Sequence, residues 1–276
     1  MRKIPLEDNF TDVIGKAQRG LGISDSELAE EAAISAADVR KLRGGEVDET
    51  VINRVAPILG LAGRALVDLA SGNWSPPDIA LPNGAAMFNT SFGDMTVNSF
   101  LVWDLKTKRG IAFDTGADCG EMLSTARNEQ VKIELILFTH SHPDHVAAFG
   151  ELRKATGAPA YIGEREVIDG AEALPEGKRL TVGALEIETL LTWGHSAGAL
   201  TYFVRGLELP LAIVGDSIFA GSMGGGAVSY KDALQNNLEK ILTLPNETII
   251  CPGHGPLTTV AKERAENPFF AAKISA

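Results

Sequence analysis

The sequence predicts an α/β protein in which a layered domain of strands and helices follows a small all-α domain. Residues 10–70 repeat apolar side chains every three or four positions, which is the period of an amphipathic helix. From residue 95 onward, β-rich apolar runs alternate with helical segments, as is typical of layered α/β domains. A stretch rich in proline and glycine, residues 71–84, separates the two patterns. We therefore expect a helical domain over residues 1–72, a linker over 73–86 and an α/β domain over 87–276.

The helical domain contains a recognisable pair of helices. The stretch ISDSELAEEAAISAADVRKLRGG, residues 23–45, predicts two short helices joined by a tight turn. Ser24 or Asp25 can cap the first helix. Ser35 can cap the second, with Asp38 as its capping-box partner, and a pair of glycines ends it. Further helices are expected over residues 49–61 and 63–72.

This pair of helices resembles the helix-turn-helix of phage-repressor-type DNA-binding domains. The resemblance implies that the second helix would enter the major groove and present Arg40, Lys41 and Arg43. Residues 1–75 nevertheless contain 9 basic and 12 acidic side chains, a net charge of −3, whereas DNA-binding domains normally present a basic face. Two interpretations stay open: a nucleic-acid-binding domain, or a helical domain used for homodimerisation or for covering the α/β domain.

Composition narrows the class of protein. The net charge of −11 disfavours partners that are nucleic acids or anionic membranes, unless a local basic patch exists. The N-terminus MRKIPLEDNF lacks the apolar run of a secretion signal, and no stretch is apolar enough for a membrane helix. We therefore expect a cytoplasmic protein. Its two cysteines, Cys119 and Cys251, are too few for a disulfide framework, and we expect both to be buried.

The α/β domain is predicted from eight apolar runs and three helical segments. Loops that follow strands are common positions for functional residues, because a rigid sheet positions them while they stay accessible. The expected helices cover residues 120–130, 144–157 and 230–244. The expected strands lie within residues 96–105, 109–116, 131–140, 158–163, 185–193, 200–206, 209–216 and 247–255.

All five histidines and two aspartates of the α/β domain stand at or just after the ends of predicted strands. The motif THSHPDH, residues 139–145, directly follows the apolar run IELILF. Three further residues follow other strands. Since chance placement would scatter some histidines onto helices or the surface, we expect a metal site. Its candidate ligands are His140, His142, Asp144, His145, His195, Asp216 and His254.

The spacing within the motif has a physical reason. In an extended turn, His140 and His142 project to the same side, so that both imidazoles can reach one ion. Pro143 favours a bend and a helix start, after which Asp144 and His145 can face a second ion. Asp216 is a carboxylate that could bridge two ions. Nitrogen-rich ligands with carboxylate support favour two zinc ions, with iron or manganese as alternatives.

The sequence HSHPDH, followed by His195, Asp216 and His254, resembles the metallo-β-lactamase superfamily over about residues 87–270. That resemblance implies an αββα sandwich. The segment AFDTG, residues 112–116, matches an early strand motif of the superfamily, in which Asp114 would support the metal loop. The alternative for Asp114 is simply the start of a turn.

Within that superfamily, GDSIFAGS, PGHGPLTT and ENPFF are most similar to motifs of the type II glyoxalases, which are hydroxyacylglutathione hydrolases. The resemblance implies that one ion is bound by three histidines and the second by a His–Asp set, with Asp216 as the bridge. The first set is His140, His142 and His195, and the second is Asp144, His145 and His254.

The resemblance implies hydrolysis of a thioester, ester or lactone by a metal-bound hydroxide. In this mechanism, Asp144 would orient the nucleophile or transfer a proton, and Asp216 would hold both ions. Glutathione hydrolases carry a C-terminal helical domain that contacts glutathione, whereas this sequence continues for only 22 residues, from 255 to 276. The segment Met223-Gly224-Gly225-Gly226 also replaces a basic residue of that group. We therefore expect another small-molecule substrate.

Two alternative functions remain. One is a mononuclear iron enzyme resembling the persulfide dioxygenases, which would use His140, His195 and Asp216. The other is a DNA-binding regulator with a metal-containing sensor domain.

Five side chains near the motifs carry secondary expectations. Ser141 and Ser196 should only permit close packing, because no histidine is left to activate them as nucleophiles. The loop at residues 221–226 could act as a lid or substrate rim, with Met223 and Tyr230 lining the site. Trp193 is expected in the core.

Overall fold

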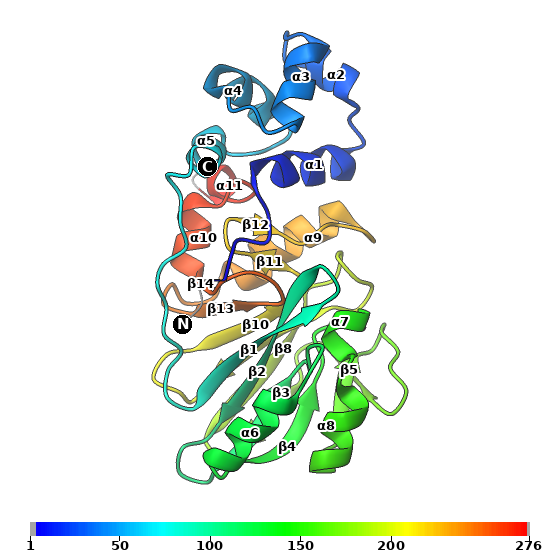
Figure 1. The fold of residues 1–276 in the computed structure, drawn as a ribbon, viewed down its shortest axis with the longest axis vertical. Coiled ribbons are helices and arrows are strands. Elements are labelled where there is room, and N and C mark those ends of the chain that lie inside the picture. Colours follow the sequence, from blue (N-terminus) through cyan, green and yellow to red (C-terminus); the bar gives the residue numbers. More distant parts are fainter. Residues whose placement is uncertain (1–3, 275–276) are drawn as a thin grey trace.

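The N-terminal helices stand at one end of the molecule, beyond the sheets (Figure 1). The structure, a computed structural model, describes residues 4–274. Ser24 and Ser35 are the N-caps of the predicted helix pair, each in a capping box with the residue three positions later, which confirms both caps. The helices of this region are α1 (Phe10–Leu21), α2 (Asp25–Glu31), α3 (Ala36–Arg43), α4 (Glu49–Ile58) and α5 (Gly63–Ala70).

The first sheet has six strands in sequence order. Its first three strands pair antiparallel and the last three continue in parallel. The strands are β1 (Ala85–Phe92), β2 (Met95–Trp103), β3 (Arg109–Phe113), β4 (Lys132–Leu137), β5 (Ala160–Gly163) and β6 (Glu172–Leu174). The helices between them are α6 (Gly120–Asn128), α7 (Pro143–Val146) and α8 (Phe149–Thr156).

The second sheet also has six strands, in the order β14-β13-β10-β9-β8-β7. These are β7 (Arg179–Val182), β8 (Leu185–Leu191), β9 (Leu200–Arg205), β10 (Leu211–Gly215), β13 (Ile249–Pro252) and β14 (Thr258–Thr259). A small hairpin joins β11 (Ile218–Phe219) to β12 (Ser222–Met223). The remaining helices are α9 (Tyr230–Asn236), the π-helix η1 (Asn237–Ile241), α10 (Val260–Glu266) and α11 (Ala271–Ile274).

Apolar packing defines four layers and confirms the predicted αββα sandwich. Between the sheets, side chains such as Phe113 and Leu137 of the first sheet meet Tyr202 and Ile213 of the second. The outer face of the first sheet packs against α6 and α8, and that of the second against α9 and α10. Cys119 and Cys251 are buried free thiols, as predicted.

The N-terminal helices share a single apolar cluster with the outer side of the second sheet. This cluster includes Phe10 and Ile14 of α1 together with Ala212, Ile250 and Phe269. Burial of such side chains is the main favourable term in folding, at about 25 cal/mol per Å² of apolar surface. The helical region is therefore packed as part of the sandwich. The division at residues 72 and 87 stays a prediction from sequence texture, and β1 already begins at Ala85.

Polar contacts also connect the N-terminal helices to the sandwich. Asp8 accepts hydrogen bonds from the Lys16 ammonium and from the Ser222 hydroxyl, the latter at 2.6 Å. Lys16 also donates to the Met223 carbonyl at 2.9 Å. Segments more than 200 residues apart in the sequence are thereby held together beside the hairpin β11–β12.

The eight predicted strands are all present, but the predicted helix over residues 144–157 is interrupted. It forms α7 and α8, separated at Ala147 and Ala148. The carbonyl of His145 accepts from the Thr115 amide at 2.8 Å and from the Thr115 hydroxyl at 3.0 Å. Because this carbonyl is already engaged outside the helix, α7 ends after one turn and its side chains are fixed against the end of β3.

Residues 4–274 contain no helix long and apolar enough to cross a membrane.

Candidate metal centre

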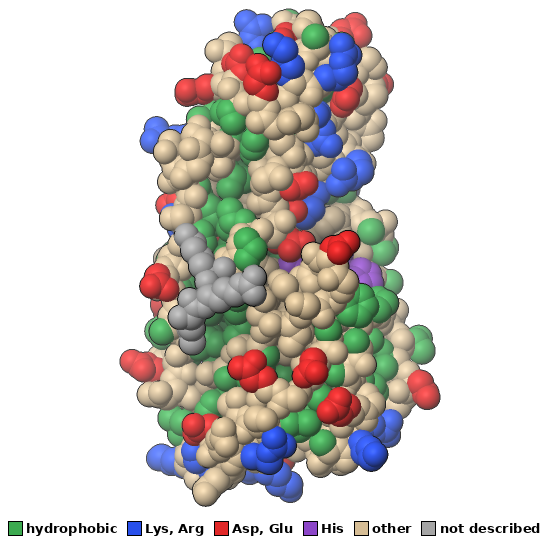
Figure 2. Space-filling view, in the orientation of Figure 1, with side chains coloured by type: hydrophobic (Ala, Val, Ile, Leu, Met, Phe, Trp, Pro, Cys, Tyr) green, Lys and Arg blue, Asp and Glu red, His purple; other side chains and the backbone are tan. Residues whose placement is uncertain are grey.

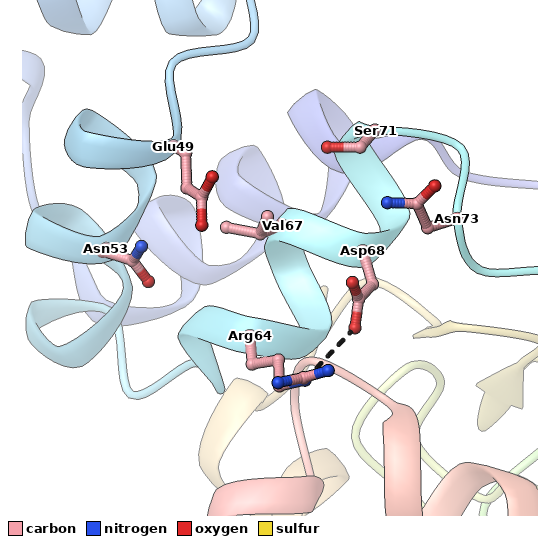
Figure 3. A pocket seen from close by; sticks show the side chains of 7 residues that line it. All are labelled: Glu49, Asn53, Arg64, Val67, Asp68, Ser71 and Asn73. Carbon is pink, nitrogen blue, oxygen red and sulfur yellow. Dashed lines mark ion pairs between the residues drawn. The ribbon is translucent and has the colours of Figure 1, made fainter.

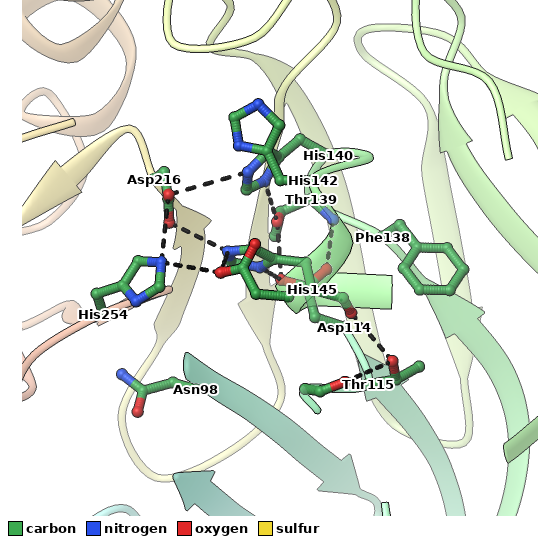
Figure 4. Close-up of polar contacts among 12 residues, drawn as sticks. Asn98, Asp114, Thr115, Phe138, Thr139, His140, His142, His145, Asp216 and His254 are labelled. Atoms are coloured by element: carbon green, nitrogen blue, oxygen red, sulfur yellow. Dashed lines mark hydrogen bonds and ion pairs between the residues drawn. The ribbon is translucent and has the colours of Figure 1, made fainter. Parts of the chain in front are cut away.

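Seven side chains from five loops and helix starts meet at one edge of the two sheets. Figure 4 shows His140, His142, His145, Asp216 and His254 among them. His140 and His142 follow β4, and α7 carries Asp144 and His145. His195 follows β8, Asp216 follows β10 and His254 follows β13. All seven predicted ligands are therefore brought together.

The seven residues form two groups, in each of which one ligand atom per residue lies within 4.8 Å of the others. We call His140, His142, His195 and Asp216 the outer cluster, because His142 and His195 are partly exposed. We call Asp144, His145 and His254 the inner cluster, because all three are buried.

Asp216 lies between the two clusters. Its carboxylate oxygens lie 3.9 Å from His140 Nε2 and 3.4 Å from His195 Nε2 in the outer cluster. They lie 3.3 Å from His145 Nε2 and 3.4 Å from His254 Nε2 in the inner cluster. This geometry is compatible with a carboxylate that bridges two ions.

Three buried ligand atoms have no hydrogen-bond partner among the described residues: His140 Nε2, His145 Nε2 and Asp216 Oδ1. Leaving a buried polar atom unpaired costs about 1–3 kcal/mol, so three such atoms converging on one place require an explanation. Imidazole nitrogens and carboxylate oxygens are the ligands that zinc and related cations prefer. The residues present fit divalent metal ions.

The outward-facing ring nitrogens are held by the protein. His145 Nδ1 donates to Asp114 at 2.8 Å, and His254 Nδ1 donates to the Thr96 carbonyl at 2.7 Å. His195 Nδ1 donates to the Gly225 carbonyl at 3.0 Å. Each of these bonds places the proton on Nδ1, which leaves the Nε2 lone pair for a metal ion.

Asp114 has the supporting position that the sequence predicted. Besides His145, it accepts from the Thr139 amide and the Thr139 hydroxyl, both at 2.8 Å. Since the Thr139 hydroxyl donates to Asp114, its oxygen can accept from His140 Nδ1 at 3.1 Å. Asp114 has a φ of 53°, in the left-handed region that few residues other than glycine adopt. A strained backbone of this kind is common at functional sites.

The electrostatics of the site favour bound cations. Burial opposes the charge on Asp216, but His145 and His254 outweigh it and hold the Asp216 pKa well below its usual range. Burial alone would lower the pKa of His145, yet Asp216 and Asp114 raise it to about 10. The carboxylates therefore attract positive charge, and a metal ion must displace protons from these imidazoles in order to bind.

Of the two serines beside the ligands, Ser141 does more than the sequence suggested, whereas Ser196 packs as expected. Ser141 donates its hydroxyl hydrogen bond to Glu166, so it is not merely a small packing residue. Ser196 is buried. Neither hydroxyl has a hydrogen bond to a histidine among the described residues, which is what nucleophilic activation would require.

The predictions that Met223 and Tyr230 line the site and that Trp193 lies in the core were wrong. Met223 is fully buried and Tyr230 nearly so, and both belong to the apolar cluster under α1 rather than lining the site. The loop at residues 221–226 is tied down, since Glu263 accepts from the Gly221 amide at 3.0 Å and Gly225 holds His195. Trp193 is partly exposed, and the Arg165 guanidinium lies 5.6 Å from its ring centroid.

Two supporting residues were missed by the sequence reasoning. Asn98 is fully buried and donates to the Pro252 and Gly255 carbonyls, both at 2.9 Å, which fixes the loop of His254. Glu166 accepts from Ser141 and from the Gly198 amide. A signal for Glu166 existed, because it follows the predicted strand over residues 158–163 just as the ligands follow theirs.

Histidine side chains reach the surface between the N-terminal helices and the sandwich, next to acidic side chains (Figure 2). A separate groove of about 440 Å³ lies along α4 and α5 and contains none of the candidate ligands (Figure 3). We place the chemistry at the clusters, because the groove has one exposed ion pair, Arg64–Asp68, and no convergent set of ligand atoms. Its lining residues are Glu49, Asn53, Arg64, Val67, Asp68, Ser71 and Asn73.

Comparison with known proteins gives a consistent result. The family described as "Metallo-beta-lactamase superfamily" matches residues 92–254. YqgX of Bacillus subtilis, named a "Probable metallo-hydrolase", is 30% identical over 204 residues, which cover 64% of this chain and 94% of YqgX. A hydroxyacylglutathione hydrolase of Cereibacter sphaeroides is 32% identical over 183 residues, which cover 64% of this chain and 66% of that protein.

The fold is also similar to solved structures. The structure of TTHA1623 in a di-iron-bound form has a TM-score of 0.55 and 28% sequence identity to this chain. The match covers 66% of this chain and 100% of TTHA1623.

Proposed function

This chain belongs to the metallo-beta-lactamase superfamily, and on that premise we propose that it is a dinuclear metal-dependent hydrolase of thioesters, esters or lactones. The observation that carries the proposal is the position of Asp216 between two clusters of ligand atoms, three of which are buried and have no hydrogen-bond partner among the described residues. Two clusters sharing one carboxylate favour a pair of ions over a single one.

The outer cluster would hold one ion and the inner cluster the other, with Asp216 shared between them. A pair of divalent cations supplies an acidified water at neutral pH and polarises a substrate carbonyl. Zinc is the proposed metal, because nitrogen ligands outnumber carboxylates. Iron is the alternative, since the similar TTHA1623 is described in a di-iron-bound form.

Asp144 is the residue best placed to accept and transfer a proton. It is buried, and its Oδ2 lies 3.2 Å from His254 Nε2 and 3.5 Å from His145 Nε2. Burial opposes its ionisation, but the hydrogen bond to His254 and the charge of His145 lower the Asp144 pKa. An ionised carboxylate here accepts a hydrogen bond from a water in the site, orients that water and can take up its proton.

The named relatives support a hydrolase, and the proposed substrate is a small molecule other than a glutathione thioester. What supports this choice of substrate is that residues 223–226 offer no basic side chain for the carboxylates of glutathione.

For the N-terminal helices, the proposed role is to cover the sandwich rather than to bind DNA. Of the three basic residues in the second helix of the pair, Arg43 is engaged, since its guanidinium donates to the Thr11 carbonyl at 2.6 Å. Lys41 is exposed and lies 3.6 Å from Glu46. Salt-dependent binding to random duplex DNA would contradict this proposal and support the regulator alternative.

Metal analysis combined with a substrate panel tests the proposed function. We expect about two zinc ions per chain and hydrolysis of at least one member of a thioester, lactone and ester panel, with a phosphodiester as the comparison. About one iron per chain, with consumption of oxygen and a persulfide, would instead support the dioxygenase alternative.

Two variants separate metal catalysis from a serine nucleophile. With excess metal present, His142→Ala should lower hydrolysis by at least about 100-fold, since it removes a ligand. Ser141→Ala should cost at most about tenfold, since its hydroxyl supports a neighbour. The opposite ranking would contradict the assignment.

A further inference from the structure

Glu166 stands in the connection between β5 and β6, outside both clusters, and its amide donates to the Gly163 carbonyl at 2.8 Å. Its side chain is partly buried. One carboxylate oxygen accepts from the Ser141 hydroxyl, and the other accepts from the Gly198 amide at 2.8 Å. Among the described residues it has no hydrogen bond or ion pair to any of the seven candidate ligands.

The two donors of Glu166 belong to the two loops that complete the outer cluster. Ser141 stands between His140 and His142, and Gly198 is three residues after His195. His142 and His195 are the two partly exposed ligands, and His142 Nδ1 lies 3.1 Å from His195 Nε2. Glu166 therefore connects the loop of one histidine to the loop of the other.

These loops are closely packed against one another. A Cβ added to Gly163 would lie 2.0 Å from the Gly198 carbonyl oxygen, and one added to Gly198 would lie 2.9 Å from Arg165 Cβ. The loop of His195 thus rests directly on the backbone that carries Glu166. His195 also donates from its own ring, to the Gly225 carbonyl, as His145 and His254 of the inner cluster donate to their acceptors. His142 Nδ1, in contrast, faces only His195 Nε2 among the described residues.

We propose that Glu166 is a positioning residue that sets the separation of His142 and His195 and thereby the affinity of the outer cluster for its metal ion. This inference rests on the proposed function, because it requires that the outer cluster bind a metal. Residues that support metal ligands typically contribute about 10–100-fold to affinity, and Glu166 acts one bond further out. The effect should therefore be close to tenfold.

The experiment measures two dissociation constants for zinc in the full chain, by competition with a chromophoric chelator. We assign the larger of the two dissociation constants to the outer cluster, because two of its ligands are partly exposed. Glu166→Ala removes both hydrogen bonds and should raise this constant about tenfold while leaving the smaller one within about twofold. Glu164→Gln, an exposed acidic residue of the same connection, is the matched control and should change neither constant.

Glu166→Gln separates position from charge. A glutamine can still accept from the Gly198 amide and can donate to the Ser141 hydroxyl, so it preserves the connection without the charge. We expect it to restore the affinity to within about threefold of wild type, against about tenfold loss for alanine. A glutamine variant as weak as the alanine variant would overturn the inference in favour of a purely electrostatic role.

Ser141→Ala supplies a second route to the same question, including the case in which Glu166→Ala does not fold. It should weaken the same dissociation constant, and its effect should not add to that of Glu166→Ala if both act through one connection. A wild-type chain that binds two zinc ions, with both constants unchanged in these variants, would overturn the inference alone. A wild-type chain that binds no metal would overturn the proposed function.

Discussion

The inner and outer clusters use similar ligands but are supported in different ways. In the inner cluster, the rings of His145 and His254 each donate directly to a fixed acceptor, Asp114 or the Thr96 carbonyl. In the outer cluster, the loops of His142 and His195 are joined through Glu166, and the ring of His195 donates to the Gly225 carbonyl. The difference teaches that one centre can combine ligands fixed by their own ring hydrogen bonds with ligands whose separation depends on a contact between two loops.

The change expected to have the largest effect is Asp216→Asn, because Asp216 serves both clusters. Loss of its charge leaves the imidazoles near it without their shared carboxylate. We expect metal content below one ion per chain and a fall in hydrolysis of at least about 1000-fold, corresponding to about 4 kcal/mol. Metal quantification and initial rates test this. Retention of one tightly bound ion would show that the clusters bind independently.

Asp114→Asn should affect the inner cluster selectively. An asparagine amide facing His145 would present a donor to a donor, which disfavours the tautomer needed for metal binding. We expect a loss of about 100-fold in the tighter zinc affinity, which is greater than the tenfold expected for Glu166→Ala. Asp94→Asn, an exposed residue, is the control. If Asp114→Asn and Glu166→Ala weaken the same ion equally, the distinction between the clusters is wrong.

The smallest expected effect concerns the segment beneath the outer cluster. Glu263 is fully buried, and it accepts hydrogen bonds from the Gly221 amide and from Asn267, which also binds the Ser222 carbonyl. Burial raises the pKa of Glu263 to about 7, against 4.5 as its ordinary value. The folded chain then holds a proton that the unfolded chain has released, so stability falls as the pH rises from about 4.5 to about 7.

Glu263→Gln should remove this dependence, because glutamine resembles the protonated acid. Between pH 5.5 and pH 8, wild type should lose about 2 kcal/mol of stability relative to the glutamine variant. Chemical denaturation at both pH values tests this, with the metal affinities as a second measurement. An identical pH dependence in the two proteins would show that Glu263 is ionised throughout that range.

The sequence predicted which seven side chains would be brought together, because these candidate ligands share a local rule. Each candidate ligand follows a buried strand, and an apolar run that ends in a polar residue can be recognised from the sequence alone. The same rule applies to Glu166, which follows β5, but its partners Ser141 and Gly198 belong to other loops. Their meeting depends on how the two sheets pack, and no spacing along the chain encodes it.

Other differences also arose from tertiary contacts. The interruption after His145 depends on Thr115, which occupies a carbonyl that a continuous helix would have used. Met223 was expected at the site because glycines surround it, yet α1 covers it. The strand β1 was missed entirely, because it begins within residues 73–86, which proline and glycine made look like a linker.

The shared apolar cluster determines whether the N-terminal helices and the sandwich can exist as separate domains. The N-terminal helices bury Phe10 and Ile14 with side chains of β10, β13 and the C-terminal end. Separated from the sandwich, they would expose that surface to water, and the sandwich would expose its own complement. We therefore expect that the helical region cannot be transferred to another protein as an independent domain. We also expect the helical region and the sandwich to fold and unfold as one cooperative unit.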